Sequence, residues 1–182
     1  MRSLTKLPVI LWLTIAGFAV AACELAVPED QYPPLTYQDL PPIKLDVASV
    51  EIETAYQPSS EPPHVELLFP VRPDEAAANW GRDRLVAAGQ SGRLRYIVRE
   101  ASATEQALET KTGVTGAFTT DQSERYKAIL GLEMEILDDQ GQIIGTVRVN
   151  SSRSITMPED SSIRDREKVW YTLTQKLMND AN

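Results

Sequence analysis

The sequence predicts an α+β domain, a two-layer sandwich in which two helices cover one face of a four-stranded, mostly antiparallel sheet in the order β-α-β-β-β-α. Apolar and polar residues alternate in four separate stretches, as in strands with one buried face. Two further stretches gather apolar residues on one side of a helix. Because each strand is apolar on a single face, both helices should cover that face and leave the other in water.

The first strand and the first helix are expected in the first half of the domain. Residues 43–54 alternate in polarity but change parity near Ala48, which a β-bulge would reconcile. The helix should begin at Pro73, because two acidic residues follow this proline and suit a helix N-terminus. It should run to about Ala88 and end at Gly89.

The next three strands are expected to form a meander. Alternation over residues 93–104 predicts the first of them, and residues 126–136, where every even-numbered residue is apolar, predict the second. Residues 138–141 are typical of a hairpin connection whose glycine adopts a positive φ. The last strand follows over residues 143–157.

The second helix is expected after Ser162, because Asp165 three residues later completes an N-cap pair. Helical spacing predicts that its buried stripe consists of Ile163, Arg166, Trp170, Leu173 and Leu177.

The first 22 residues are typical of a signal peptide. Arg2 and Lys6 precede an uncharged apolar run over residues 7–20, and a membrane-spanning helix needs about 20 residues, more than this run provides. The segment Val20-Ala21-Ala22-Cys23 resembles the lipobox of bacterial lipoproteins. This resemblance implies cleavage before Cys23, a diacylglycerol thioether on its sulfur and acylation of its new amino group. The alternative is an ordinary secretory signal cut near Ala22.

Cys23 is the only cysteine, which excludes an intrachain disulfide and any zinc site built on several thiolates. A free thiol in an oxidising compartment would be a liability, which favours lipidation. The lipoprotein resemblance also assigns Glu24 a sorting role, because aspartate at this position favours inner-membrane retention and glutamate is not the usual signal. We therefore expect a lipid anchor in the outer membrane, facing the periplasm.

Charge and proline are concentrated between the signal and the domain. Residues 23–63 hold eight acidic residues and one lysine, and ten of the eleven prolines beyond the signal lie between residues 28 and 73. An acidic, proline-rich stretch is typical of an extended spacer.

The chain accordingly divides into a signal peptide over residues 1–22, a lipidated tether over residues 23–42 and an α+β domain over residues 43–182. Fully extended at about 3.1 Å per residue, the tether would reach about 60 Å. In the alternative, the segment packs along the domain through Tyr32, Leu35 and Tyr37.

Few residues suit catalysis. His64, the only histidine, follows two prolines in a predicted loop without a nucleophile motif and is expected to be a surface or capping residue. Glu133 and Glu135 share a strand face, but an exposed strand does not exclude the water that a raised carboxyl pKa requires to be absent. Asp138-Asp139 lacks calcium-loop spacing. We predict no catalytic residue, metal or cofactor; the alternative is an envelope hydrolase using His64 or the carboxylate pair.

Basic side chains should gather on the open face of the sheet, where Glu133 and Glu135 also lie. Ion pairs across strands would explain them, each contributing a few tenths of about 1 kcal/mol. The alternative is a docking surface for an anionic lipid or an acidic protein. The residues concerned are Arg93, Arg95, Arg99, Lys127 and Arg148.

A lipobox followed by this order of elements resembles the lipopolysaccharide-assembly lipoprotein and, in outline, the lipoproteins that accompany lipid-transport systems. The resemblance covers roughly residues 43–180 as an order of elements, and the long acidic approach departs from the pattern. It implies a non-enzymatic partner in outer-membrane biogenesis or lipid transport, or an inner-membrane accessory of a transporter. Expected partners are the membrane, an envelope protein or an anionic lipid; the net charge of −8 and the envelope address argue against nucleic acid.

Overall fold

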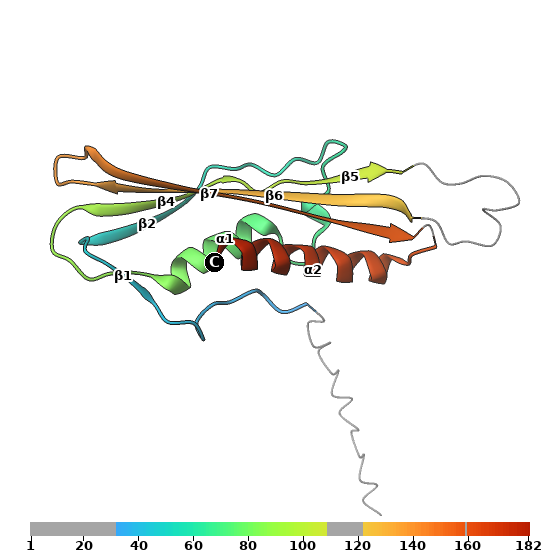
Figure 1. Ribbon diagram of the computed structural model, residues 1–182, viewed down its shortest axis with the longest axis horizontal. Helices are drawn as coiled ribbons and strands as arrows, with labels where there is room; N and C mark the ends of the chain where they lie inside the picture. The colour runs from blue at the N-terminus through green and yellow to red at the C-terminus, as the bar shows by residue number, and fades with distance from the viewer. Residues whose placement is uncertain (1–31, 109–121, 159) are drawn as a thin grey trace, which may run out of the picture. The chain divides into compact units, whose positions relative to one another are not determined.

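The computed structural model describes residues 32–108, 122–158 and 160–182 (Figure 1). Its main sheet contains β2 (Ser49–Thr54), β4 (Arg93–Glu100), β5 (Ala103–Ala107), β6 (Gln122–Leu137) and β7 (Ile143–Pro158). β4 and β5 pair one after the other along one side of β6, and β7 pairs along its other side. The sheet is therefore four strands wide, with β2 beside β4 in the one parallel pairing among these strands.

Both helices, α1 (Pro73–Arg84) and α2 (Ile163–Ala181), lie on the same side of this sheet (Figure 1). The Tyr96 hydroxyl of β4 donates to the Ala77 carbonyl of α1 at 3.0 Å. The Ser151 hydroxyl of β7 donates to the Leu177 carbonyl of α2 at 3.4 Å. These contacts confirm the predicted two-layer α+β sandwich.

The core lies between the helices and the sheet. As the alternation predicts, Tyr126, Ala128 and Leu130 of β6 are fully buried, and Leu173 and Leu177 of α2 meet them from below. Full burial of a large apolar side chain stabilises a fold by about 1.5–3 kcal/mol.

The N-terminus of α2 is capped as predicted. The Ser162 hydroxyl accepts from the Asp165 backbone N–H at 3.2 Å, and the Asp165 carboxylate accepts from the Ser162 N–H at 3.0 Å. The predicted buried stripe is wrong at Ile163, which is 71% exposed. The helix meets the sheet about one turn later, where Arg166 donates to the Glu124 carboxylate of β6 at 2.6 Å.

The predicted strand over residues 43–54 is in fact two strands in different sheets. β1 (Ile43–Leu45) pairs in parallel with β3 (Leu85–Ala87), whereas β2 joins the main sheet. The predicted bulge near Ala48 is therefore a break in the strand, and the predicted first helix stops at Arg84 because the following residues form β3.

Gly89 explains why this crossing is possible. Its N–H donates to the Val47 carbonyl at 3.0 Å, and a Cβ at this position would lie 2.6 Å from the backbone carbonyl carbon of Asp46. Only glycine permits this approach of the two backbones.

Residues 32–42, here called the strap, pack across both helices. The Tyr37 N–H donates to the Asp83 carboxylate of α1 at 2.8 Å, and the Tyr171 hydroxyl of α2 donates to the Pro33 carbonyl at 3.1 Å. The rings of Tyr32 and Tyr171 are 5.3 Å apart. The described part of the predicted tether thus follows the packing alternative, and the compact unit begins at Tyr32 rather than at residue 43.

The signal peptide over residues 1–22, Cys23, Glu24 and the rest of the tether to residue 31 lie outside the described residues. In the part of the chain that is described, neither α1 nor α2 combines the length and the apolar character that crossing a membrane requires.

Candidate functional site

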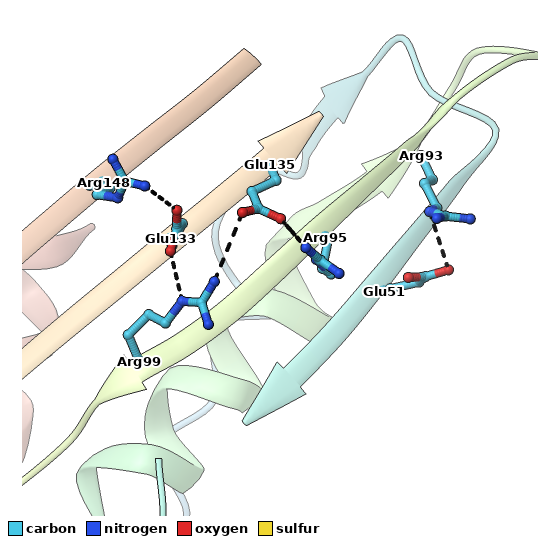
Figure 2. A network of polar contacts seen from close by, with 7 residues as sticks. All are labelled: Glu51, Arg93, Arg95, Arg99, Glu133, Glu135 and Arg148. Atoms are coloured by element: carbon cyan, nitrogen blue, oxygen red, sulfur yellow. Dashed lines mark hydrogen bonds and ion pairs between the residues drawn. The ribbon is translucent and has the colours of Figure 1, made fainter. Parts of the chain in front are cut away.

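The face of the sheet opposite the helices carries a cluster of alternating charges (Figure 2). We call it the arginine–glutamate network; its members are Glu51, Arg93, Arg95, Arg99, Glu133, Glu135 and Arg148. It crosses the sheet from β2 through β4 and β6 to β7. Strand pleating places these residues on the face opposite the buried Tyr96 because side chains of alternate residues point to opposite sides.

Glu133 lies at the centre of this network between two arginines. Arg99 Nε donates to Glu133 Oε2 at 2.7 Å, and Arg148 Nη2 donates to Glu133 Oε1 at 2.6 Å. The Glu133 side chain is only 7% exposed, whereas the Arg148 side chain is 68% exposed. The arginines therefore cover the carboxylate and keep their own contact with water.

Glu135 is held in the same way. Arg95 donates to Glu135 Oε2 from Nε at 2.9 Å and from Nη2 as well. Arg99 Nη2 lies 3.9 Å from Glu135 Oε1 and so joins the two carboxylates. At the β2 edge, Arg93 Nε lies 3.9 Å from Glu51 Oε1.

The arginines hold these carboxylates in the charged form. The hydrogen bond from Arg99 lowers the pKa of Glu133, burial opposes this effect, and the hydrogen bond from Arg148 reinforces it. The hydrogen bond to Glu135 raises the pKa of Arg95. A carboxylate with a lowered pKa holds no proton at neutral pH, so this geometry does not suit the acid role in glycoside hydrolysis.

Four of the five basic residues singled out in the sequence belong to the network: Arg93, Arg95, Arg99 and Arg148. Lys127 lies on the same face farther along β6, opposite Thr104 of β5 and Ser154 of β7. The cross-strand ion pairs match one of the two expectations for this face. Binding of an anionic partner stays a prediction, and such a partner would compete with three carboxylates already in place.

A second polar cluster surrounds Glu66 in the 3-10 helix η1 (Glu66–Leu68), at the edge of β5. We call Tyr56, Ser59, His64, Glu66 and Ala103 the Glu66 cluster. Glu66 is fully buried, and its carboxylate accepts from the Tyr56 hydroxyl at 2.6 Å. It also accepts from the backbone N–H groups of Ser59 at 2.9 Å and Ala103 at 3.1 Å.

These donors determine the charge of Glu66. Burial alone would raise its pKa, but the hydrogen bonds from Tyr56, Ser59 and Ala103 outweigh burial, and the pKa is lowered. Burial, and then the contact with Glu66, raises the pKa of Tyr56. The sequence analysis did not single out Glu66, although an acid inside the short apolar stretch 65–69 is a usable signal of a buried carboxylate.

His64 stands beside this carboxylate, with Nδ1 at 3.4 Å from Glu66 Oε2. Its side chain is 33% exposed and lines a shallow groove of about 330 Å³ with Pro62, Pro63, Val65, Glu105 and Ala107. In the described part of the chain, Glu66 is the one side chain to which His64 is hydrogen-bonded. The same residues contain no group of three or more acidic, histidine or cysteine side chains placed to hold a metal ion.

Comparisons with known proteins complete this description. No protein-family model matches the chain, and no curated protein matches it. A crystal structure of a candidate lipoprotein from Caulobacter crescentus CB15 is 13% identical, with 72% of this chain and 85% of that chain covered and a TM-score of 0.29. The PelC dodecamer from Paraburkholderia phytofirmans is 16% identical, with 74% and 87% covered and a TM-score of 0.25. TM-scores this low carry no argument about function.

Proposed function

We propose that this protein is a lipid-anchored lipoprotein of the bacterial outer membrane that faces the periplasm and serves as a non-enzymatic binding or assembly partner in outer-membrane biogenesis or lipid transport. The observation that carries the proposal is the position of the only cysteine, Cys23, at the end of Val20-Ala21-Ala22 after an uncharged apolar run. Three acyl chains would make the anchor effectively permanent, because each buried CH₂ contributes about 0.8 kcal/mol.

The charged sites support a binding role rather than a catalytic one. Glu133 is charged and covered by two arginines, and Glu66 is buried among hydrogen-bond donors. Neither carboxylate is placed to exchange protons with a substrate at neutral pH. A sheet face that exposes arginine side chains over buried glutamates is instead a rigid polar surface, which suits recognition of a complementary partner.

Lipidation is tested by expressing the full chain in a bacterium supplied with a labelled fatty acid. Wild type should incorporate the label and fractionate with the outer membrane. Cys23→Ser should lose both the label and membrane attachment. Ala22→Gly is the matched control, because it keeps a small residue before the cysteine and should be labelled like wild type. A labelled Cys23→Ser chain, or an unlabelled wild type, would contradict the proposal.

The sorting part of the proposal depends on Glu24 and has its own test. Glu24→Asp should redistribute the protein towards the inner membrane while leaving its lipid label unchanged. Wild type that fractionates with the inner membrane would favour the alternative role as an accessory of an inner-membrane transporter.

A hydrolase remains the second candidate, and the contact of His64 Nδ1 with the Glu66 carboxylate favours it. A carboxylate in this position orients an imidazole for proton transfer. His64→Ala decides the matter: loss of function with an unchanged unfolding temperature would support the hydrolase, whereas full function would remove it.

A further inference from the structure

The two outer strands of the sheet leave their outward edges open. Within the described residues, β7 pairs only with β6, and β2 pairs only with β4. β7 is 16 residues long and contains no proline before its last residue, Pro158. A long strand with an unpaired row of N–H and C=O groups is a ready template for another strand, and proteins normally shield such edges.

The strand register shows that the charges on the open face alternate in sign across the sheet. Glu51 of β2 stands opposite Arg95 of β4, which stands opposite Glu135 of β6. In the neighbouring row, Glu133 of β6 stands opposite Arg148 of β7. The order from edge to edge is therefore acidic, basic, acidic, basic, with the acidic end on β2 and the basic end on β7 (Figure 2).

This alternation gives the two open edges opposite charge. At the basic end, the Arg148 side chain is 68% exposed, although one nitrogen is bonded to Glu133. At the acidic end, the Glu51 side chain is 53% exposed, and Glu53 follows on the same face. A second copy placed beside the first would continue the same alternating order without interruption.

We propose that copies of this chain associate head to tail, the β7 edge of one copy pairing with the β2 edge of the next. β2 is parallel to β4, and both β4 and β7 are antiparallel to β6, so β7 and the incoming β2 run in the same direction. Because Glu53 occupies the row of Glu133 and Arg148, continuing the row sets Arg148 beside Glu53 of the next copy, with Glu51 one pleat away.

The helix layer has room for this arrangement. Four strands at about 4.8 Å span about 19 Å, and two helices packed at about 8–10 Å fill nearly the same width. A two-fold pairing of two β7 edges is disfavoured, because α2 packs chiefly against β7. Such a pairing would place two α2 helices about 5 Å apart, closer than helices pack.

A contact between unlike edges leaves one edge free on each outer copy. Head-to-tail association therefore does not stop at two copies and produces either a ring or an open array. Assemblies larger than a dimer are thus expected, and a two-fold contact would instead stop at the dimer.

The test is sedimentation of the full lipidated chain in detergent at about 1–100 µM, where specific protein association is commonly observed. Wild type should form species larger than a dimer in a concentration-dependent manner. Arg148→Glu, and separately Glu51→Arg with Glu53→Arg, should weaken association by about tenfold or more, because like charges then meet at the contact. Lys168→Glu on α2 makes the same charge change away from both edges and should associate like wild type.

Mixing the two charge variants provides the decisive measurement. The glutamate introduced on β7 of one variant meets the arginines introduced on β2 of the other, and the remaining contact in the mixture is between wild-type edges. The mixture should regain assemblies that neither variant forms alone. Ser152→Glu, which leaves the Arg148–Glu133 pair intact, serves as a second β7 variant if Arg148→Glu lowers the unfolding temperature. A monomeric wild type, a dimer that does not grow, or association unaffected by every edge variant would each overturn the proposal.

Discussion

The arginine–glutamate network and the Glu66 cluster both bury carboxylates, but they satisfy them in different ways. Glu133 is held by fully charged arginines that also reach water, whereas Glu66 is held by the Tyr56 hydroxyl and two backbone N–H groups. The arginines regain water if Glu133 is removed, and the buried donors around Glu66 do not. The difference teaches that the loss on removing a buried charge depends on where its partners can turn afterwards.

The largest effect is expected from Glu66→Ala. This change leaves the Tyr56 hydroxyl and the N–H groups of Ser59 and Ala103 without their acceptor, and each such loss amounts to about 1–3 kcal/mol. The free energy of unfolding in urea should fall by about 3 kcal/mol or more. The exposed Glu61→Ala is the control and should stay within about 0.5 kcal/mol of wild type. A small loss for Glu66→Ala would contradict the contrast with the network.

The pH dependence should be the next largest effect. The pKa of Glu66 is lower in the folded chain than in the unfolded chain, so the unfolded state binds more protons and stability rises with pH between the two values. This contribution is fully present above the ordinary glutamate pKa of about 4.3 and is lost as the pH falls through the folded value. Urea unfolding at pH 5 and pH 3 should show a smaller loss for Glu66→Gln than for wild type. Equal losses would show that Glu66 does not titrate as described.

Tyr56→Phe tests a single donor of the same cluster. It removes the hydrogen bond of 2.6 Å but keeps the aromatic ring, so the free energy of unfolding should fall by about 1.5 kcal/mol, a typical value for a bond to a charged group. Unfolding temperature and urea midpoint measure the change. Tyr32→Phe, whose hydroxyl is bonded at 3.4 Å on the surface, is the matched control and should change less.

The smallest effect should be the salt dependence of the network. A double-mutant cycle on Arg99→Gln and Glu133→Gln should give a coupling that weakens from low salt to 1 M NaCl, where the Debye length falls to about 3 Å. The same cycle on Tyr56→Phe and Glu66→Gln should be insensitive to salt. Coupling at Arg99 and Glu133 that persists in 1 M NaCl would make the two sites alike after all.

Local signals in the sequence predicted much of the fold. The alternation in β6, the hairpin with Gly141 at φ 79° and the Ser162–Asp165 cap each depend on residues close together in the chain, and each is confirmed. The failures have a common cause. The break after Leu45 and the early end of α1 both follow from pairing between β1 and β3, forty residues apart in the chain, which no local pattern indicates.

The candidate site was predictable to a similar degree. Alternation placed the basic residues and Glu133 on one face, but the partner of each arginine depends on the register between strands. That register joins Arg95 to Glu135 across forty residues of sequence. Glu66 was missed because its donors come from loop 55–59 and from Ala103, and only the folded chain brings them together.

The strap also changes the distance at which an anchored domain would work. Because the compact unit begins at Tyr32, nine peptide steps separate it from Cys23, and these extend to about 30 Å at most, half the reach of a free tether. Lipidated copies would thus occupy a thin layer beside the bilayer and meet mainly by moving within its plane. Such confinement raises their effective concentration, so a contact between sheet edges that is weak in solution would become appreciable at the membrane.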